Sequence, residues 1–139
     1  CLLDAATETR LEEWGGLNVM VVMDDGTVAT PRLSGTILEG VTRDSVLTLL
    51  REGGSAVQER DIPMTELLDG VRSGRIREVF ACGTAAVITP IGRLAAHDFD
   101  VTVGDGTPGE VTTSLYNHLT DIQFGRAEDA HGWLYPLVR

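Results

Sequence analysis

The apolar run Leu17–Met23 (LNVMVVM) constrains the fold of this chain more than any other segment. Its length and its β-branched residues are typical of a strand that is buried inside a sheet. The dipeptide Asp25-Gly26 follows, and this pair is a strong signal for a tight hairpin turn. We therefore expect residues 27–30 to return as a neighbouring strand, which ends at Pro31 because proline lacks a backbone donor.

Three further segments have the apolar spacing and the end signals of helices. The first opens at Thr42, which suits the N-cap position, carries Asp44 near the positive end of the helix dipole and stops at Gly53. The second covers Met64–Ser73, with Thr65 as its cap. The third opens with a capping-box pattern and then repeats apolar residues at helical spacing: Thr107, Pro108 and Glu110, followed by Val111, Leu115, Leu119 and Ile122.

The remaining extended segments complete an alternating pattern of strands and helices. We expect strands at residues 55–60, 78–82, 86–89 and 98–103. Such alternation indicates a mixed α/β fold class. No linker or repeat divides the chain, so residues 1–139 are expected to form a single domain. The tail, residues 125–139, is irregular, and we expect Trp133 and Tyr135 to pack against the body of the protein.

Composition excludes several classes of function. The formal net charge of the 139 residues is −10, and the arginines are scattered singly, so nucleic acid is not an expected partner. No apolar run is long enough to predict a membrane-spanning helix, and the first residues lack the pattern of a signal peptide. The two cysteines, Cys1 and Cys82, lie far apart, which argues against a disulfide framework and favours a cytoplasmic location.

The sequence contains no lysine, because all 11 of its Lys and Arg residues are arginine. Chemistry that needs a side-chain amine, such as formation of a Schiff base, therefore cannot come from this chain as it stands. The histidines, His97, His118 and His131, lack the spacing of metal ligands, and no metal site is predicted. Cys82 lies in an apolar segment and is expected to be a small buried residue rather than a nucleophile.

Two glycine-threonine motifs have the chemistry of anion sites. Gly40-Val41-Thr42 would place the free N–H groups of a helix start beside a hydroxyl. Gly83-Thr84-Ala85 would interrupt a strand and leave N–H groups available to an anion. Taken alone, each motif is more often an ordinary helix cap or an ordinary bulge. Two interpretations are likewise open for Glu13, which comes shortly before a glycine pair. Its carboxylate is either held in a pocket or part of a solvated turn.

Taken together, the motifs resemble those of the fold-type IV, pyridoxal-phosphate-dependent branched-chain aminotransferases. The resemblance covers nearly the whole chain, and its order and spacing are more specific than any single motif. The segments that carry it are residues 13–18 (EWGGLN), 38–43 (LEGVTR), 79–86 (VFACGTAA), 89–90 (TP), 121–125 (DIQFG) and 131–133 (HGW).

The resemblance implies roles for individual residues. Glu13 matches the carboxylate that pairs with the pyridine nitrogen of the cofactor, and Leu38 matches the apolar residue that packs on its ring. Val41 and Thr42 match the positions that hold the cofactor phosphate at a helix start. Thr84 matches a second phosphate-binding hydroxyl. Together with Ala85, it also matches the loop whose N–H groups receive the substrate carboxylate.

Three departures from the family pattern matter. The family often has proline where this chain has Glu39, so we expect a looser turn there. Some relatives carry a redox Cys-x-x-Cys where this chain has Ala86 and Thr89, so thiol regulation of that kind is not expected. The lysine that forms the Schiff base lies upstream of the matched region in the family, as does the small N-terminal domain. No catalytic residue is therefore assigned within this chain.

The resemblance implies a C-terminal portion of the large, pseudo-barrel domain of such an enzyme. The complete enzyme would use pyridoxal phosphate to transfer an amino group between leucine, isoleucine or valine and 2-oxoglutarate, and it would be a homodimer. We expect the chain alone to be inactive and to be a fragment that needs the missing N-terminal portion. The alternatives are a non-catalytic domain that binds a phosphorylated ligand, or a structural subunit that needs a lysine-bearing partner chain.

Overall fold

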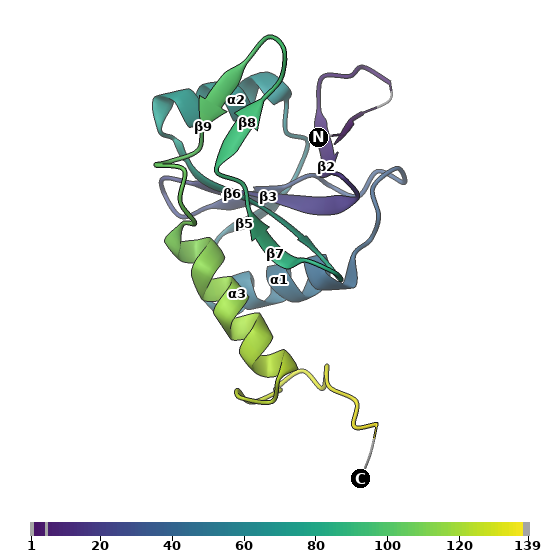
Figure 1. The fold of residues 1–139 in the computed structure, drawn as a ribbon. Helices are drawn as coiled ribbons and strands as arrows, with labels where there is room; N and C mark the ends of the chain where they lie inside the picture. The colour runs from purple at the N-terminus through teal and green to yellow at the C-terminus, as the bar shows by residue number, and fades with distance from the viewer. Residues whose placement is uncertain (1, 5, 138–139) are drawn as a thin grey trace.

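The computed structural model describes residues 2–4 and 6–137, which form a mixed α/β fold (Figure 1). The main sheet is built from β1 (Leu2–Leu3), β2 (Leu11–Trp14), β3 (Leu17–Met23), β4 (Val28–Thr30), β5 (Val57–Glu59), β6 (Ile76–Gly83) and β7 (Val87–Pro90). A separate hairpin contains β8 (Arg93–Ala95) and β9 (Asp100–Thr102). The helices are α1 (Val41–Glu52), α2 (Met64–Ser73) and α3 (Glu110–Gln123).

Strand β3 is the centre of the main sheet. Along one edge it pairs antiparallel with β6, from Asn18 opposite Cys82 to Met23 opposite Ile76. Along its other edge, the first residues of β3 pair with β2 and the later ones with β4. The hairpin predicted at Asp25-Gly26 is therefore confirmed as the β3–β4 connection. Strands β6 and β7 form a second hairpin beside β3.

Alternate side chains of β3 enter two different cores, so the predicted burial of this strand is confirmed. Val19 and Val21 pack in the core that α2 and the β8–β9 hairpin cover. Met20 and Val22 pack in the core that α1 and α3 cover. The sheet thus lies between two layers (Figure 1). Over the described part of the chain, no helix has both the length and the apolar character that crossing a bilayer requires.

The first two helices begin without a side-chain cap. Helix α1 starts at Val41 with Gly40 at the N-cap, and helix α2 starts at Met64 with Pro63 at the N-cap. The predictions that Thr42 and Thr65 are caps are therefore wrong, because both residues lie inside the first turn. Local sequence favours threonine at an N-cap, but contacts with the sheet decide where α1 begins.

Helix α3 starts at Glu110 with Gly109 at the N-cap, so the predicted capping box at Thr107 is also wrong. Thr107 bonds instead to Asp105, because both its N–H and its hydroxyl donate to Oδ1 of that residue. The N–H groups at the start of α3 are accepted by Glu78 of β6, which lies far away in the sequence.

The tail after α3 has no regular structure up to residue 137, as predicted. Trp133 is partly buried against the core under α1 and α3, and its ring stacks on His131 with ring centroids 4.4 Å apart. His131 also lies 3.0 Å from the Glu52 carboxylate at the end of α1. Tyr135 is 85% exposed, so the prediction that it packs on the body is wrong. His131 and Trp133, which make these contacts of the tail, both precede Tyr135.

Candidate functional site

The residues predicted to bind a cofactor gather at one end of the sheet. Glu13 pairs across the sheet with Asn18, and Asn18 pairs with Cys82, so the three residues lie side by side on β2, β3 and β6. The turn that contains Thr84 begins two residues after Cys82, beyond Gly83 at the end of β6. The segment 38–42, which leads into α1, lies over the same strands because its backbone bonds to Glu13 and Asn18.

Glu13 is buried, with 8% of its surface exposed. Its Oε1 atom accepts a hydrogen bond from the backbone nitrogen of Leu38 at 2.7 Å. Among residues 2–4 and 6–137, no donor is bonded to its Oε2 atom. A buried carboxylate is costly unless it is paired, so this second oxygen is available to a donor on a ligand. The solvated turn that the sequence left open for this residue does not form.

Leu38 has a fixed backbone and a free side chain. Its carbonyl accepts hydrogen bonds from Nδ2 of Asn18 at 3.0 Å and from the backbone nitrogen of Gly40 at 2.9 Å. A hydrogen bond thus closes the turn over Glu39, and the expectation that this turn is looser than in the family stays a prediction. The Leu38 side chain is 67% exposed, which leaves an apolar surface beside Glu13. An apolar side chain held in this way can pack against a flat ring.

The start of α1 offers backbone donors to an anion. The first helical bond runs from the nitrogen of Asp44 to the carbonyl of Gly40, so the N–H groups of Val41 and Thr42 have no acceptor within the helix. Val41 is 80% exposed and Thr42 is half-buried. The dipole of α1 adds positive potential at this point. The arrangement suits a phosphate or a carboxylate.

Arg43 anchors this helix start from below, although sequence reasoning did not single it out. Its side chain is 6% exposed, and Nη2 lies 2.9 Å from Oε1 of Glu59 on β5. The same Nη2 donates to the carbonyl of Pro31 at 3.2 Å. The Nε atom is buried without a partner among the described residues. Arg43 thus points into the protein and does not extend the exposed anion site.

Thr84 and Ala85 are exposed at the tip of the β6–β7 hairpin, so this segment connects two paired strands. The predicted interruption of a single strand and the alternative of an ordinary bulge are both wrong. The turn is tight, because Gly83 pairs with Val87 across it, and Val87 has a φ of 55° that a β-branched residue rarely adopts. A Cβ on Gly83 would overlap Cδ2 of Leu17, so a larger residue there would require the Leu17 side chain to move. Thr84 and Ala85 are therefore accessible to a ligand.

Cys82 is fully buried below this turn, as the sequence predicts. Burial raises the pKa of its thiol to about 12, against a smaller opposing effect of the charge on Arg43. The thiol therefore stays protonated at neutral pH and does not act as a nucleophile.

Asn18 is the site residue that sequence reasoning missed. It is 5% exposed and lies inside the run Leu17–Met23, where its neighbours are apolar. A single polar residue in a buried strand needs a hydrogen-bond partner, and this one finds it in Leu38. The presence of an amide side chain within an otherwise apolar strand was the sequence signal that could have identified Asn18.

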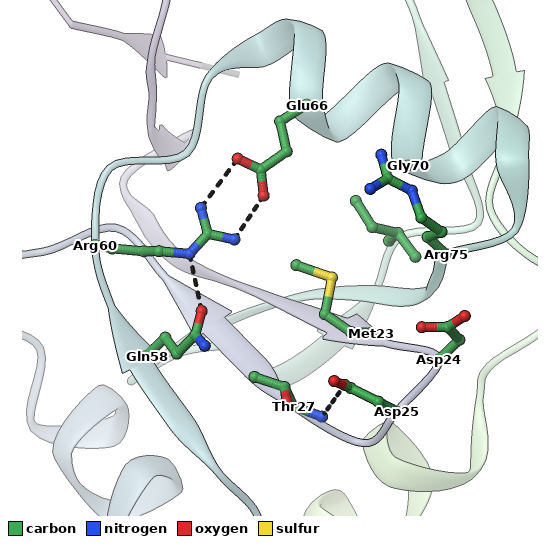
Figure 2. A pocket seen from close by; sticks show the side chains of 10 residues that line it. Met23, Asp24, Asp25, Thr27, Gln58, Arg60, Glu66, Gly70 and Arg75 are labelled. Carbon is green, nitrogen blue, oxygen red and sulfur yellow. Dashed lines mark hydrogen bonds and ion pairs between the residues drawn. The ribbon is translucent and has the colours of Figure 1, made fainter.

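A cavity of about 280 Å³ lies at the opposite end of β3, around Met23 (Figure 2). Several of its charged groups already have partners. The guanidinium of Arg60 donates to both carboxylate oxygens of Glu66 and to Gln58, and Asp25 accepts from the nitrogen of Thr27. No predicted site residue lines it, and we assign it no function.

Comparison with known proteins identifies the family. The family model for class IV amino-transferases matches residues 5–94. A branched-chain-amino-acid aminotransferase of Mycolicibacterium smegmatis is 48% identical over 138 residues, which are 97% of this chain and 38% of that protein. A probable branched-chain-amino-acid aminotransferase of Streptomyces coelicolor is 43% identical and covers 99% of this chain and 38% of its own length. The chain thus spans about 38% of the length of these curated relatives.

Solved structures agree with the sequence relatives. The branched-chain amino acid aminotransferase of Escherichia coli superposes with a TM-score of 0.80 at 32% identity, over 94% of this chain and 39% of that one. The enzyme from Thermobaculum terrenum, in its PLP-bound holo-form, has a TM-score of 0.79 at 33% identity, over 96% of this chain and 40% of that one. The mixed α/β architecture is therefore that of fold-type IV enzymes. The family match, the fold and the grouped site residues together place this chain in the class IV aminotransferase family.

Proposed function

We propose that this chain supplies the cofactor-binding side of a branched-chain amino acid aminotransferase. The complete enzyme uses pyridoxal phosphate to move an amino group between leucine, isoleucine or valine and 2-oxoglutarate. The observation that carries this proposal is the grouping of a buried carboxylate, an exposed leucine and an uncapped helix start at one end of the sheet. The names of the relatives, and the PLP-bound holo-form of one solved neighbour, support the substrate and the cofactor.

The residues present fit the three parts of pyridoxal phosphate. The free Oε2 of Glu13 would hold the proton on the pyridine nitrogen, and the side chain of Leu38 would pack against the ring. The start of α1 would bind the phosphate through the N–H groups of Val41 and Thr42 and through the hydroxyl of Thr42. When bound, the cofactor supplies an electron sink for the bond that breaks at the substrate Cα. A protonated ring nitrogen strengthens that sink, which is why a carboxylate is needed at residue 13.

The hairpin tip completes the anion-binding groups. We assign the hydroxyl of Thr84 to the cofactor phosphate, and the backbone donors of Thr84 and Ala85 to the substrate carboxylate. Both residues are exposed and lie at the same end of the sheet as the start of α1. Because the formal charge of the chain is −10, anions must be bound by such local donors rather than by the long-range field.

The lysine that carries the cofactor and moves the Cα proton must come from outside these 139 residues, because they contain none. We therefore propose that residues 1–139 are the C-terminal portion of the large domain, and that they work with an N-terminal portion of the same enzyme. A homodimer in the cytoplasm is the proposed form of the complete protein. The chain alone should bind the cofactor and catalyse no transfer.

The test uses pyridoxine 5'-phosphate, which binds like the cofactor but cannot form a Schiff base. Titration calorimetry should show that it binds more tightly than pyridoxine, because the phosphate engages the start of α1. Thr42→Val should weaken binding about tenfold through the loss of a hydrogen bond to a charged group. Thr48→Val is the matched control, since its hydroxyl bonds to the Asp44 carbonyl within α1 and is not assigned to the ligand. Equal binding of pyridoxine and its phosphate ester would contradict the proposal.

The second candidate function, a non-catalytic domain for a phosphorylated ligand, is favoured by the lack of lysine. The two functions differ in whether the natural protein contains further residues that supply a lysine. Borohydride reduction with pyridoxal phosphate, followed by denatured mass measurement of the natural protein, separates them. A mass well above that of 139 residues, with one reduced cofactor attached, supports the aminotransferase. A mass equal to this chain, without a side-chain adduct, supports the binding domain.

A further inference from the structure

We propose that Asn18 is a positioning residue that sets the spacing between the ring subsite and the phosphate subsite. This inference rests on the function proposed above and deepens it. We assign Asn18 no contact with the cofactor itself. It acts through the backbone of the segment 38–40, which carries the ring-packing leucine at one end and the start of α1 at the other.

Two hydrogen bonds hold Leu38 against neighbouring strands. The Nδ2 atom of Asn18 on β3 donates to the Leu38 carbonyl at 3.0 Å, and Oε1 of Glu13 on β2 accepts from the Leu38 nitrogen at 2.7 Å. Glu13 and Asn18 are themselves direct partners across the sheet. Both polar groups of one residue are therefore tied to an adjacent pair of buried side chains. The side chains of Glu13 and Asn18 therefore fix how far the segment 38–40 lies from the sheet.

The second contact of Asn18 is steric and involves Gly40. A Cβ placed on Gly40 would lie far inside van der Waals contact with Oδ1 of Asn18. Gly40 has φ −67° and ψ 132°, a conformation that any residue adopts. Glycine here leaves space for the Asn18 amide and is not needed for backbone freedom. The amide of Asn18 fills the space under the N-cap and lets α1 begin close to the sheet.

Through these two contacts, Asn18 sets the distance between the ring subsite and the phosphate subsite. That distance affects only a ligand that occupies both subsites at once. Inorganic phosphate occupies the start of α1 alone, and pyridoxine occupies the ring subsite alone. Pyridoxine 5'-phosphate must reach both at once, and its advantage over either part depends on how well the two subsites are spaced. Loss of Asn18 frees the segment 38–40 to move relative to Glu13, while each subsite keeps its own residues.

The first experiment measures binding of these three probes to the chain and to Asn18→Ala. We expect the affinity for pyridoxine 5'-phosphate to fall about tenfold, and that for inorganic phosphate to change less than about twofold. Amide exchange at Leu38 should accelerate in the same variant. Thr36→Val is the matched control, because it removes an exposed hydrogen bond from the same loop to Glu12 of β2. It should change neither binding nor exchange.

The second experiment tests the contact with Gly40. Gly40→Ala should weaken binding of pyridoxine 5'-phosphate in the otherwise natural chain, because the new methyl group displaces the Asn18 amide. In the Asn18→Ala background it should have little further effect, since the nearest remaining atom, Cβ of Arg43, lies 3.6 Å from the new methyl position. Such coupling between Gly40→Ala and Asn18→Ala would not arise if each substitution merely destabilised the fold.

The outcomes separate this inference from the function on which it rests. If the natural chain binds pyridoxine 5'-phosphate no better than inorganic phosphate, both proposals fall. If it prefers pyridoxine 5'-phosphate and Asn18→Ala keeps that preference, only the positioning role is overturned. Equal losses for all three probes, or equal harm from Gly40→Ala in both backgrounds, would likewise overturn it. A selective loss together with the coupling would support it.

Discussion

Glu78 of β6 caps helix α3 by accepting two hydrogen bonds from Thr112. Its Oε2 atom lies 2.8 Å from the backbone nitrogen of Thr112 and 2.7 Å from the Thr112 hydroxyl. Its Oε1 atom accepts from the nitrogen of Val111 at 3.0 Å. The carboxylate also fills the space at the N-cap, because a Cβ on Gly109 would overlap its Cδ. A strand side chain thus decides where this helix begins.

Removal of that cap should destabilise the protein. Glu78→Ala leaves three donors at the start of α3 without their acceptor, and we expect a loss of about 1–2 kcal/mol in the free energy of unfolding. Urea unfolding followed by circular dichroism measures it. Glu110→Ala is the matched control, because it removes an exposed carboxylate from the same helix turn. Equal effects of the two substitutions would contradict the capping role.

The buried guanidinium of Arg43 should contribute more to the free energy of unfolding than the exposed guanidinium of Arg51, which contacts the same carboxylate. Arg43 and Arg51 both contact Glu59, but their side chains are 6% and 51% exposed. Arg43→Gln breaks the contacts of this buried guanidinium with Glu59 and the Pro31 carbonyl, and should cost about 2–3 kcal/mol. Arg51→Gln should cost about 0–0.5 kcal/mol, as exposed ion pairs do. Unfolding free energies of both variants in urea provide the comparison, and similar values for the two would refute it.

Stability should decrease in acid through Asp4. The hydroxyl of Thr7 and the backbone nitrogens of Arg10, Thr7 and Thr9 donate to this carboxylate and hold its pKa well below the usual range. In the unfolded chain, Asp4 has an ordinary aspartate pKa of about 3.9. The unfolded chain therefore binds more protons than the folded chain at low pH. The resulting stabilisation is present in full above that value and is lost as pH falls toward the folded pKa.

The measurement compares the natural chain with Asp4→Asn between neutral pH and acid. We expect Asp4→Asn to be less stable at neutral pH, and the difference to narrow below about pH 4. Asp98→Asn is a suitable control, because this carboxylate is exposed on the β8–β9 hairpin and accepts no bond from a backbone nitrogen in the described structure. A difference that stays constant with pH would exclude Asp4 as the source.

The thiol of Cys82 should be unreactive in the folded protein, because burial raises its pKa to about 12. Iodoacetamide at mildly alkaline pH should add nothing to folded Cys1→Ser chain within the time that modifies a free thiol. In concentrated urea the same chain should gain one adduct by mass. A Ser114→Cys substitution on the exposed side of α3 is the positive control. Rapid labelling of the folded Cys1→Ser chain would show that Cys82 is accessible.

Periodic burial is the feature of this fold that the sequence predicts well. The run Leu17–Met23 is the central strand, and Leu115, Leu119 and Ile122 form the buried face of α3. The helix Met64–Ser73 also matches its predicted bounds. These features depend on the spacing of apolar residues along a short stretch, which is visible without knowledge of any partner. The resemblance to a family supplied the site residues, and the register of β2, β3 and β6 brings their segments to one end of the sheet.

Helix starts and the support of the site depend on residues that are distant in sequence. Thr42 and Thr107 have the local chemistry of caps, yet Gly40 and Gly109 occupy those positions, because Asn18 and Glu78 fill the space that a side chain would need. The same is true of Arg43, which meets Pro31 and Glu59 only once β4 and β5 have paired. The sequence by itself thus determined which segments are buried and which elements they form. Tertiary structure decided where the helices begin and what holds Leu38 above Glu13, because hydrogen bonds and steric exclusion act between atoms that only folding brings together.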